Sequence, residues 1–306
     1  MSALSRHVED YLRLRRALGF KLEREGQLLG QLVAYLETAS AATLSSELAI
    51  AWAGEPAGVQ PNHWAKRLGV ARRFAAYLQT VDPATEVPPP GVFPARRCRP
   101  TPYQWSQRDI CRLLDGARAL RSPLRAATHE ALFGLLAASG MRIGEVVALQ
   151  RDDLDLDAGV ITVHEAKFDR SRLVPLHLST IEALRRYAAA RDRLCPRPRS
   201  SAFFLSSTGT ALNRSGVGKT FRKITIAIGV RTATVHPRIH DLRHSFAVHT
   251  LIEWQRSGVN VDEHIATLST YLGHVSPAGT YWYLSASPEL MELAAERLHT
   301  RFGAAR

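Results

Sequence analysis

A proline-rich stretch in the first third of the chain constrains the fold more than any other feature. Residues 86–103 read EVPPPGVFPARRCRPTPY, with six prolines and hardly any apolar periodicity. Proline fixes its own backbone and lacks an amide donor, so this stretch can form neither a helix nor a central strand. The sequence therefore predicts a first domain over residues 1–85, a linker over 86–103 and a second domain over 104–306.

The net charge points to a polyanionic partner. The 306 residues carry 40 lysines and arginines against 28 acidic residues, which gives a net charge of +12. A hydrophobic content of 45% is enough to bury a core in each of two domains. This excess of positive charge favours nucleic acid over a membrane surface as the partner, with a basic but otherwise ordinary enzyme as the alternative.

The cysteines and the apolar runs indicate a cytoplasmic protein. Cys98, Cys111 and Cys195 are odd in number and far apart, which suits neither a disulfide framework nor a zinc knuckle. The first twenty residues are too charged for a signal-peptide core. No apolar run approaches the roughly 20 residues that cross a bilayer. We therefore expect a reducing, cytoplasmic location and no membrane partner.

The first domain has the apolar spacing of amphipathic helices. Val8, Tyr11 and Leu12 lie three and four residues apart, and similar sets follow within residues 28–36 and 64–78. We place the basic residues of the last helix away from its apolar stripe, and more arginines follow in the linker. The candidate nucleic-acid contacts are Lys66, Arg67, Arg72, Arg73, Arg96, Arg97 and Arg99. For the linker arginines, a solvated charge run is the alternative.

The second domain is predicted to be helical with one β-hairpin. In GVITVHEAKFDRSRLVPLH, residues 160–164 alternate like a half-buried strand, and a polar turn separates them from residues 173–176. Lys167 then lies near the tip of the hairpin. The predicted fold class is mainly α with a small β-hairpin or sheet (α+β).

One segment of the second domain superficially matches a nucleotide-binding loop. RSGVGKT, residues 214–220, contains the Gly-Lys pair of such a loop, but Asn213 stands where the first glycine is needed. No strand leads cleanly into the segment either. We therefore reject nucleotide binding here.

The stretch HDLRH, residues 240–244, can be interpreted as a zinc site or as a phosphate site. The metalloprotease motif needs Glu after its first histidine, and this chain has Asp241. A helix would also place Arg243 on nearly the same face as His240, and a guanidinium stays charged beside a metal ion. Because guanidinium groups bind phosphate oxygens bidentately, we favour the phosphate site. A zinc hydrolase using His240 and His244 is the rival, and a capped helix with an incidentally polar first turn is the bland alternative.

Two helices that end in glycine are predicted to present further polar residues. In ASGMRIGEVVAL, Gly140 is expected to end one helix, and Arg142 opens the next, where the helix dipole favours an anion. In YLGHVSPAGTYWYL, Gly273 ends a helix and His274 follows it. A Ser-Pro pair can then start a new helix that carries Tyr283.

The order of these residues resembles that of the tyrosine recombinases, also called phage-integrase-type or Xer-like recombinases. The match is dense from about residue 128 to residue 283 and loose before the linker. One departure is AKF around Lys167, where the family usually has glycines beside the lysine. The resemblance implies a helical core-binding domain and a catalytic domain that grip opposite faces of a DNA duplex. It also implies the catalytic set Arg142, Lys167, His240, Arg243, His274 and Tyr283.

Metal-free cleavage of a phosphodiester needs positive charge and hydrogen-bond donors at the non-bridging oxygens. Arg142 and Arg243 would hold the scissile phosphate, and His274 would donate a further hydrogen bond to it. Glu145 follows Arg142 by one helical turn and would orient that arginine rather than react.

The same cleavage needs a nucleophile and a proton for the leaving oxygen. The family pattern of Thr, two residues, then Tyr selects Tyr283 as the nucleophile, and Tyr281 is expected to pack. His240 could accept the tyrosine proton, and Lys167 could protonate the departing 5′ oxygen. The residues alone do not separate acid from base, so these two roles lean on the resemblance.

The resemblance implies a site-specific DNA recombinase of the integrase or transposase type, working through a 3′-phosphotyrosine without metal, cofactor or ATP. A non-catalytic DNA-binding protein of the same fold and a type IB topoisomerase-like enzyme are the alternatives. The expected partners are double-stranded DNA, with nucleoid association when bound, further copies of the chain in a tetrameric synapse, and accessory recombinases or DNA-bending proteins. A C-terminal helix over residues 287–302 would dock on a neighbouring protomer or pack on its own domain.

Overall fold

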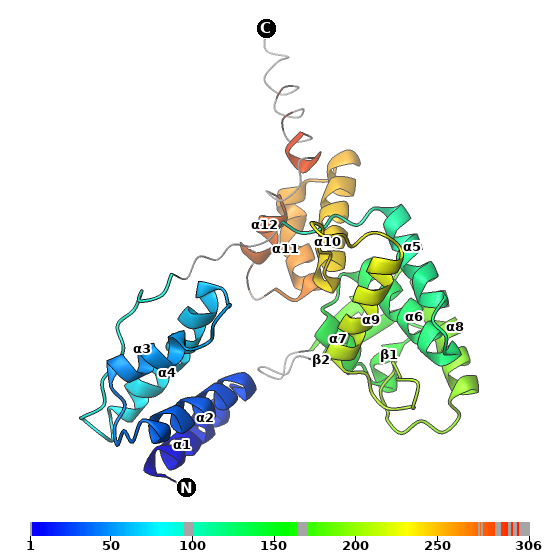
Figure 1. Ribbon diagram of the computed structural model, residues 1–306. Coiled ribbons are helices and arrows are strands. Elements are labelled where there is room, and N and C mark those ends of the chain that lie inside the picture. The colour runs from blue at the N-terminus through cyan, green and yellow to red at the C-terminus, as the bar shows by residue number, and fades with distance from the viewer. Residues whose placement is uncertain are drawn as a thin grey trace. The chain divides into compact units, whose positions relative to one another are not determined.

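The chain forms two compact units, over residues 1–100 and 101–306 (Figure 1). The structure is a computed structural model that describes residues 2–94, 101–164, 171–274, 276, 278–284, 289–292, 295 and 299. Across these residues no helix combines the length and the apolarity needed to cross a bilayer. The two units are described separately below.

The first unit is a helical bundle around a leucine-rich core. Its helices are α1 (Ala3–Ala17), α2 (Glu23–Thr38), α3 (Ser46–Gly54) and α4 (Pro61–Leu78). Ser2 and Ser45 cap α1 and α3 by accepting hydrogen bonds from backbone amides of the first turn. Leu32 of α2, Trp52 of α3 and Phe74 of α4 are buried in one apolar cluster. The bundle therefore depends on apolar faces meeting, as the helical spacing predicted.

The first part of the expected linker packs on this bundle. Residues 86–94 contain neither helix nor strand, as their prolines require. The Glu86 amide donates to the Leu44 carbonyl (2.9 Å), and the Phe93 ring lies 5.8 Å from the Trp64 ring. The segment from residue 86 to 94 thus belongs to the first unit, whereas the expectation ended that domain at residue 85.

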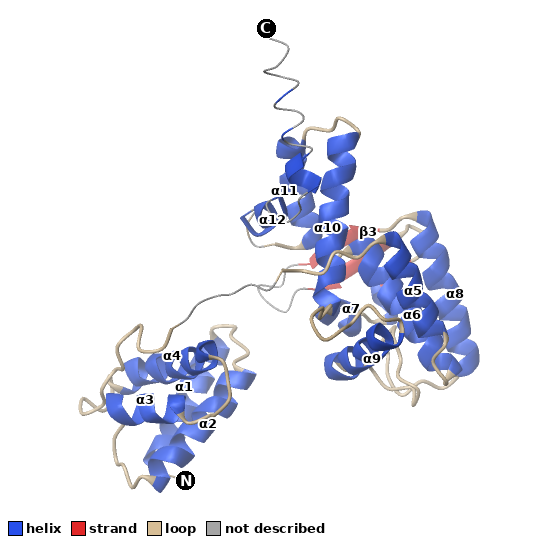
Figure 2. Ribbon diagram, turned by 45° about the horizontal axis from the view of Figure 1, so that its top comes forward, coloured by secondary structure: helices blue, strands red, loops and turns tan. Residues whose placement is uncertain are grey.

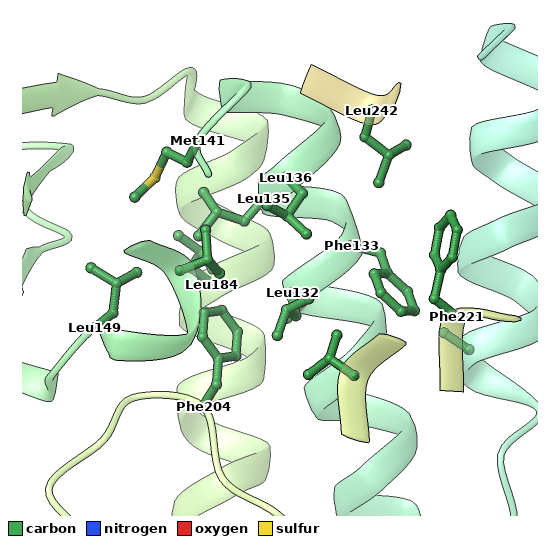
Figure 3. Close-up of a cluster of buried hydrophobic side chains, with 14 of the residues drawn as sticks. Leu132, Phe133, Leu135, Leu136, Met141, Leu149, Leu184, Phe204, Phe221 and Leu242 are labelled. Carbon is green, nitrogen blue, oxygen red and sulfur yellow. The ribbon is translucent and has the colours of Figure 1, made fainter. Parts of the chain in front are cut away.

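The second unit is mostly helical and is centred on one long helix. Its helices are α5 (Gln107–Arg118), α6 (Pro123–Ser139), α7 (Ile143–Ala148), η1 (Arg151–Asp153), α8 (Leu178–Leu194), α9 (Arg214–Ala227), α10 (Ile239–Arg256), α11 (Val261–Leu272) and α12 (Ala278–Leu284). Helix α6 packs against α5, α8 and α10. Its Leu132, Phe133 and Leu136 lie in the core beside Phe204 and Phe221 (Figure 3). This core holds the helix ends that carry the candidate site.

A small antiparallel sheet completes the second unit (Figure 2). Its strands are β1 (Leu154–Asp155), β2 (Val160–His164) and β3 (Ser171–Pro175), in the order β1-β2-β3. The register pairs Val160 with Pro175 and His164 with Ser171. Ile161, Val163 and Val174 are buried, so one face of the sheet covers the core. The predicted hairpin is confirmed, and β1 adds a strand that the sequence pattern did not indicate.

Candidate active site

A buried arginine joins the ends of two helices. Gly140 ends α6 at a φ of +60° and Gly273 ends α11 at +68°, a backbone region that favours glycine. Arg243 of α10 donates from Nη1 to the Gly140 carbonyl (2.8 Å) and from Nη2 to the Leu272 carbonyl (2.7 Å). Only 2% of Arg243 is exposed. Carbonyls at helix C-termini carry partial negative charge, so they are suitable partners for a buried guanidinium.

Arg142 approaches the same place from the start of α7. Its Nη1 donates to Glu145 Oε1 (2.7 Å), its backbone amide donates to Oε2 (2.9 Å), and its Nη2 donates to the Gly273 carbonyl. The side chain keeps 38% of its surface exposed. Arg142 and Arg243 therefore converge on the turn after α11, one open to solvent and one buried.

His274 and Tyr283 stack beside these arginines. The His274 Nδ1 atom lies 2.7 Å from the Thr280 hydroxyl, and its ring lies 6.0 Å from the Tyr283 ring at an interplanar angle of 23°. Thr280 and Tyr283 are one turn apart on α12, and both are buried. Tyr281 is 49% exposed, which corrects the expectation that it packs. It projects away from the buried face because it is out of step with Thr280 and Tyr283.

Two histidines of the candidate site are held neutral. Burial and the charges of Arg243 and Arg142 lower the pKa of His274 to about 4. Partial burial of the ring and the charge of Arg243 also lower the pKa of His240, although that residue as a whole stays exposed at the start of α10. Both imidazoles therefore lack a proton at neutral pH. A neutral imidazole can accept a proton on one nitrogen and donate from the other.

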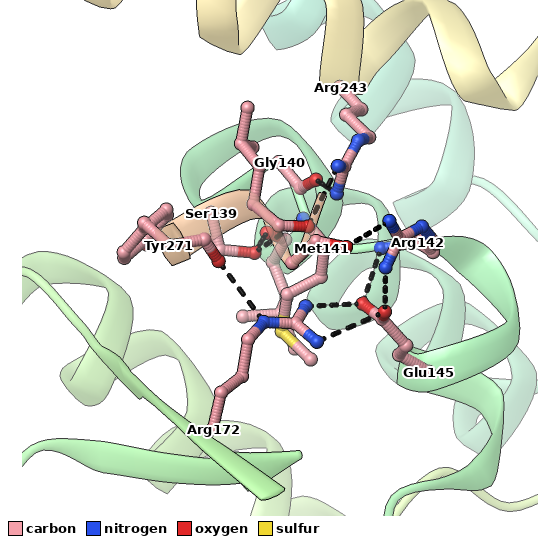
Figure 4. Close-up of polar contacts among 11 residues, drawn as sticks. Ser139, Gly140, Met141, Arg142, Glu145, Arg172, Arg243 and Tyr271 are labelled. Carbon is pink, nitrogen blue, oxygen red and sulfur yellow. Dashed lines mark hydrogen bonds and ion pairs between the residues drawn. The ribbon is translucent and has the colours of Figure 1, made fainter. Parts of the chain in front are cut away.

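Glu145 is shared by two arginines. Arg172 of β3 donates from Nη1 to Glu145 Oε1 (3.2 Å) and from Nη2 to Oε2 (2.7 Å), as Figure 4 shows. Burial alone would raise the pKa of Glu145, but the hydrogen bonds from Arg172 and Arg142 outweigh it and lower that pKa. Arg172 was not among the predicted site residues. The only signal for it is its place in the strand RLVPL, three residues before the proline.

His244 links the nucleophile candidate to the start of the second unit. It is buried, with its ring centroid 5.0 Å from Trp282 and 5.1 Å from Tyr283. Its Nε2 lies 3.3 Å from Gln104 Nε2. Burial lowers the pKa of His244 to about 4. The residue therefore packs against the tyrosine rather than pairing with His240 around a metal.

Zinc binding and nucleotide binding were the two other chemistries considered for this domain. Within the described residues, no group of three or more His, Cys, Asp or Glu side chains is arranged to hold a metal ion. Residues 214–220 lie inside α9 with Asn213 as the helix cap, so RSGVGKT is a helical turn and not a phosphate loop. Neither arrangement supports a zinc or nucleotide site at these positions.

The basic residues predicted on α4 have three different environments. Lys66 and Arg73 are exposed and line a hollow of about 490 Å³ together with Arg24. Arg67 is 6% exposed, donates to the Trp52 carbonyl (2.8 Å) and lies 4.0 Å over the Trp52 ring. Arg67 is thus turned inward, which corrects its placement away from the apolar stripe. The reason is that α3 supplies a ring and a carbonyl for it.

Arg72 binds the chain that follows the bundle. Its Nε donates to the Pro88 carbonyl and its Nη2 to the Pro89 carbonyl, each at 3.0 Å. This side chain is therefore already engaged in holding the proline-rich segment. The remaining predicted residues lie outside the described part of the chain: Arg96, Arg97, Arg99 and Lys167. So does most of the expected C-terminal helix 287–302.

Comparisons with known proteins show what the chain is similar to. The model of the phage integrase family matches residues 106–289. The protein y4rB of Sinorhizobium fredii (strain NBRC 101917 / NGR234), named as an integrase/recombinase, is 43% identical over 99% of both chains. The tyrosine recombinase XerC of Azotobacter vinelandii (strain DJ / ATCC BAA-1303) is 30% identical, covering 78% of this chain and 74% of its own.

Solved structures share the fold. The Tn1549 transposon integrase, in complex with a circular intermediate DNA, matches with a TM-score of 0.67 and 16% identity, covering 97% of this chain and 100% of that one. The XerH site-specific recombinase bound to its difH substrate matches with a TM-score of 0.66 and 19% identity, covering 88% and 77%. At this level of identity the likeness concerns the fold alone.

Proposed function

Because this chain belongs to the phage integrase family, we propose that its candidate site cleaves and rejoins DNA strands with Tyr283 as the nucleophile. The chain is a site-specific recombinase of the tyrosine recombinase type. One observation carries the assignment of the site. Arg142 at the start of α7, Arg243 of α10, His274 after α11 and Tyr283 of α12 meet around the ends of α6 and α11.

The two arginines are suited to hold a scissile phosphate. The carbonyl bonds of Arg243 use two of its five N–H donors and fix the plane of the guanidinium. Arg142, which is partly exposed, can supply donors from the solvent side. We assign the Thr280 hydroxyl as the donor to His274 Nδ1, so that the neutral ring carries its proton on Nε2 and can donate it to a phosphate oxygen. These donors would stabilise the charge that develops in the transition state.

The proposed step balances as a simple exchange of bonds. The Tyr283 oxygen attacks phosphorus, a 3′-phosphotyrosine forms, and the bond to the 5′ oxygen breaks. The lowered pKa of His240 makes it a proton acceptor for the tyrosine hydroxyl at neutral pH. We assign protonation of the 5′ oxygen to Lys167 from its place in the family pattern. The phosphotyrosine keeps the energy of the broken bond, so rejoining needs no ATP.

We further propose double-stranded DNA as the substrate and an assembly of several protomers on it. The comparison structures include XerH on difH DNA and a lambda integrase dimer on a core site, which supports this choice for a chain with a net charge of +12. Four protomers in synapsis, contacts through residues 287–302, and accessory recombinases or DNA-bending proteins complete the proposal. The protein would act in the cytoplasm, on the nucleoid.

A covalent-adduct assay tests the nucleophile. Duplexes would be selected from a random library by binding to the purified protein, and then nicked near the bound centre so that cleavage releases a short fragment. We expect adducts that survive denaturation with the wild type and with Tyr281→Phe, the matched control. No adduct should form with Tyr283→Phe. Adducts with that variant would contradict the assignment of Tyr283.

The same assay separates the alternative functions. DNA binding without any adduct from the wild type would favour a non-catalytic DNA-binding protein of this fold. Relaxation of supercoiled plasmids that lack the selected site would favour a type IB topoisomerase-like enzyme. Stoichiometric zinc in the purified protein, with cleavage lost on chelation, would favour the zinc hydrolase.

A further inference from the structure

We infer that Arg172 is a positioning residue that holds Glu145, and through it Arg142, in the geometry required for strand cleavage. This inference rests on the proposed function of the site. It concerns an arginine on strand β3, which lies 30 residues after Arg142 and 71 before Arg243 by their numbers in the chain.

The contacts of Arg172 tie three elements together. Both of its terminal nitrogens donate to Glu145 of α7, at 3.2 and 2.7 Å, and its Nε donates to the Tyr271 carbonyl of α11 (3.1 Å). The side chains of Arg172 and Glu145 are only 11% and 13% exposed. Bidentate, charge-assisted hydrogen bonds in such a place are strong and directional. The arginine of β3 thus fixes the position of α7 relative to the end of α11.

Glu145 in turn orients Arg142. Each oxygen of its carboxylate accepts hydrogen bonds from both arginines. Oε1 accepts from Arg142 Nη1 (2.7 Å) and from Arg172 Nη1 (3.2 Å). Oε2 accepts from the Arg142 amide (2.9 Å) and from Arg172 Nη2 (2.7 Å). Arg172 thereby holds the same carboxylate that binds Arg142, from a second direction (Figure 4). Without Arg172, that carboxylate would keep one arginine partner and gain freedom to rotate. Arg142, which is partly exposed, would follow it.

Arg172 also sets the turn that presents His274. A Cβ atom on Gly273 would lie 2.7 Å from the Arg172 Cζ atom, so the guanidinium packs directly against that glycine. The Gly273 carbonyl accepts from Arg142, and His274 follows next in the chain. Strand β3 begins one residue before Arg172, immediately after the segment that contains Lys167. One side chain therefore connects the strand after Lys167 with both Arg142 and the His274 turn.

The pH dependence of cleavage offers a readout that a purely structural role would not change. Among the described residues, the charged groups that interact with Glu145 are Arg142 of α7, Arg172 of β3 and Arg243 of α10. Tyr271 and His274, at the end of α11, interact with Arg172. Burial pushes the pKa of Glu145 up, and the bonds from Arg172 are the largest opposing cause. Removing Arg172 should raise that pKa. Protonation of Glu145 would then release Arg142 at a higher pH than in the wild type.

The test compares Arg172→Gln, Arg172→Lys and the exposed control Arg185→Gln on the selected nicked duplex. Arg185 is 52% exposed and pairs with Asp157 on the surface. We expect Arg172→Gln to slow single-turnover adduct formation about tenfold or more, since small misplacements of catalytic groups cost about that much. Its DNA affinity should stay within about twofold, and the acid limb of the pH–rate profile should move to higher pH. Arg172→Lys should restore part of the rate, and the control should match the wild type.

Several outcomes would overturn the inference. One is an Arg172→Gln variant that cleaves at the wild-type rate with an unshifted acid limb of the pH–rate profile. Another is an Arg172→Gln variant that loses affinity and rate equally, which would indicate that Arg172 contacts DNA. Failure of the wild type itself to form adducts would instead count against the proposed function.

A double variant covers the case in which Arg172→Gln folds poorly. Glu145→Gln with Arg172→Gln removes one negative and one positive charge, so the net charge at this place stays as in the wild type. It should cleave at about the rate of Glu145→Gln alone if Arg172 acts through Glu145, because residues in one chain of contacts are not additive. A further loss of rate in the double variant would contradict the inference.

Discussion

At the scale of single residues, the site is built on buried charge that depends on backbone partners. Arg243 is 2% exposed, and burial lowers its pKa, while its interaction with Tyr283 opposes that change. The guanidinium of Arg243 nevertheless stays charged at neutral pH. The carbonyls of Gly140 and Leu272 compensate for the lost hydration. The same residue that would bind phosphate therefore also holds two helix ends together.

Arg243→Gln should lower the free energy of unfolding as well as abolish cleavage. Glutamine cannot reach both carbonyls, so at least one buried acceptor would lose its partner, at a cost of about 1–3 kcal/mol. Urea unfolding followed by circular dichroism measures this. The surface variant Arg185→Gln should change stability by less than about 0.5 kcal/mol. Equal stability of Arg243→Gln and the wild type would show that the helix ends do not need the arginine.

His244 should make stability fall in acid. Its pKa is near 4 in the folded chain, below the ordinary 6.5, because it is buried. As the pH falls from about 6.5 to about 4, the His244 imidazole therefore binds a proton in the unfolded chain but not in the folded chain. Its contribution to stability is complete above pH 6.5 and is lost across that window. For a fully buried ring, the loss amounts to about 3 kcal/mol.

The variant His244→Phe isolates this effect, because phenylalanine keeps a flat ring against Trp282 and Tyr283 and cannot titrate. Unfolding free energies of both proteins would be measured from pH 7 to pH 4. The unfolding free energy of the wild type should fall by about 3 kcal/mol relative to that of the variant as the pH is lowered across that range. Parallel curves would mean that His244 does not control the acid sensitivity.

At the scale of elements, helix ends place the chemistry, and Gly140 shows how tight the arrangement is. Its φ is +60°, and a Cβ atom there would lie 2.5 Å from Phe246 Cδ1 and 3.1 Å from Leu272 Cδ2. Helices α6, α10 and α11 therefore meet where only a glycine fits. The close approach is what lets Arg243 reach both the Gly140 and the Leu272 carbonyl.

Gly140→Ala should destabilise the protein by more than the left-handed backbone alone explains. That strain costs about 1–2 kcal/mol, and overpacking at a helix contact adds about 1–3 kcal/mol. Gly218→Ala is the matched control, because Gly218 lies within helix α9 with no atom within 4 Å of its added Cβ. It should gain up to about 1 kcal/mol. Thermal unfolding of both variants checks the contrast, and similar melting temperatures would contradict it.

The elements of this site follow local rules, and those were predictable. Gly140 and Gly273 end helices where their apolar patterns stop, and helical spacing puts Arg243 one turn after His240. The hairpin followed from alternation over residues 160–164. The pattern was also sufficient to indicate the family, because the order of the motifs along the chain is specific.

Contacts between distant segments were not predictable. Arg172 and Glu145 are 27 residues apart, and an arginine in a short strand resembles a solvated side chain until its partner is placed. Arg67 looked exposed by helical spacing, yet the ring and carbonyl of Trp52, 15 residues earlier, draw it inward. In both cases a tertiary partner overrides the local pattern. Charge and spacing alone do not identify that partner.

At the scale of the whole molecule, the net charge of +12 governs how the chain would meet DNA. Contacts between basic side chains and phosphates release counterions, so affinity falls steeply with salt. In the first unit, Lys66 and Arg73 are exposed beside Arg24, whereas Arg67 is buried on Trp52. Neighbouring basic residues of one helix should therefore contribute differently to DNA binding.

The salt dependence of binding separates these roles. For each phosphate contact that is lost, the slope of log affinity against log salt should become shallower by about 0.9. We expect this for Lys66→Gln and for Arg73→Gln, with unchanged unfolding free energies. Arg67→Gln should keep the wild-type slope and instead lose about 1–3 kcal/mol of stability, because the Trp52 carbonyl and ring lose their partner. Fluorescence anisotropy on the selected duplex across a salt series measures the slopes. A wild-type slope for both exposed variants would mean that the exposed residues of α4 do not face the phosphates.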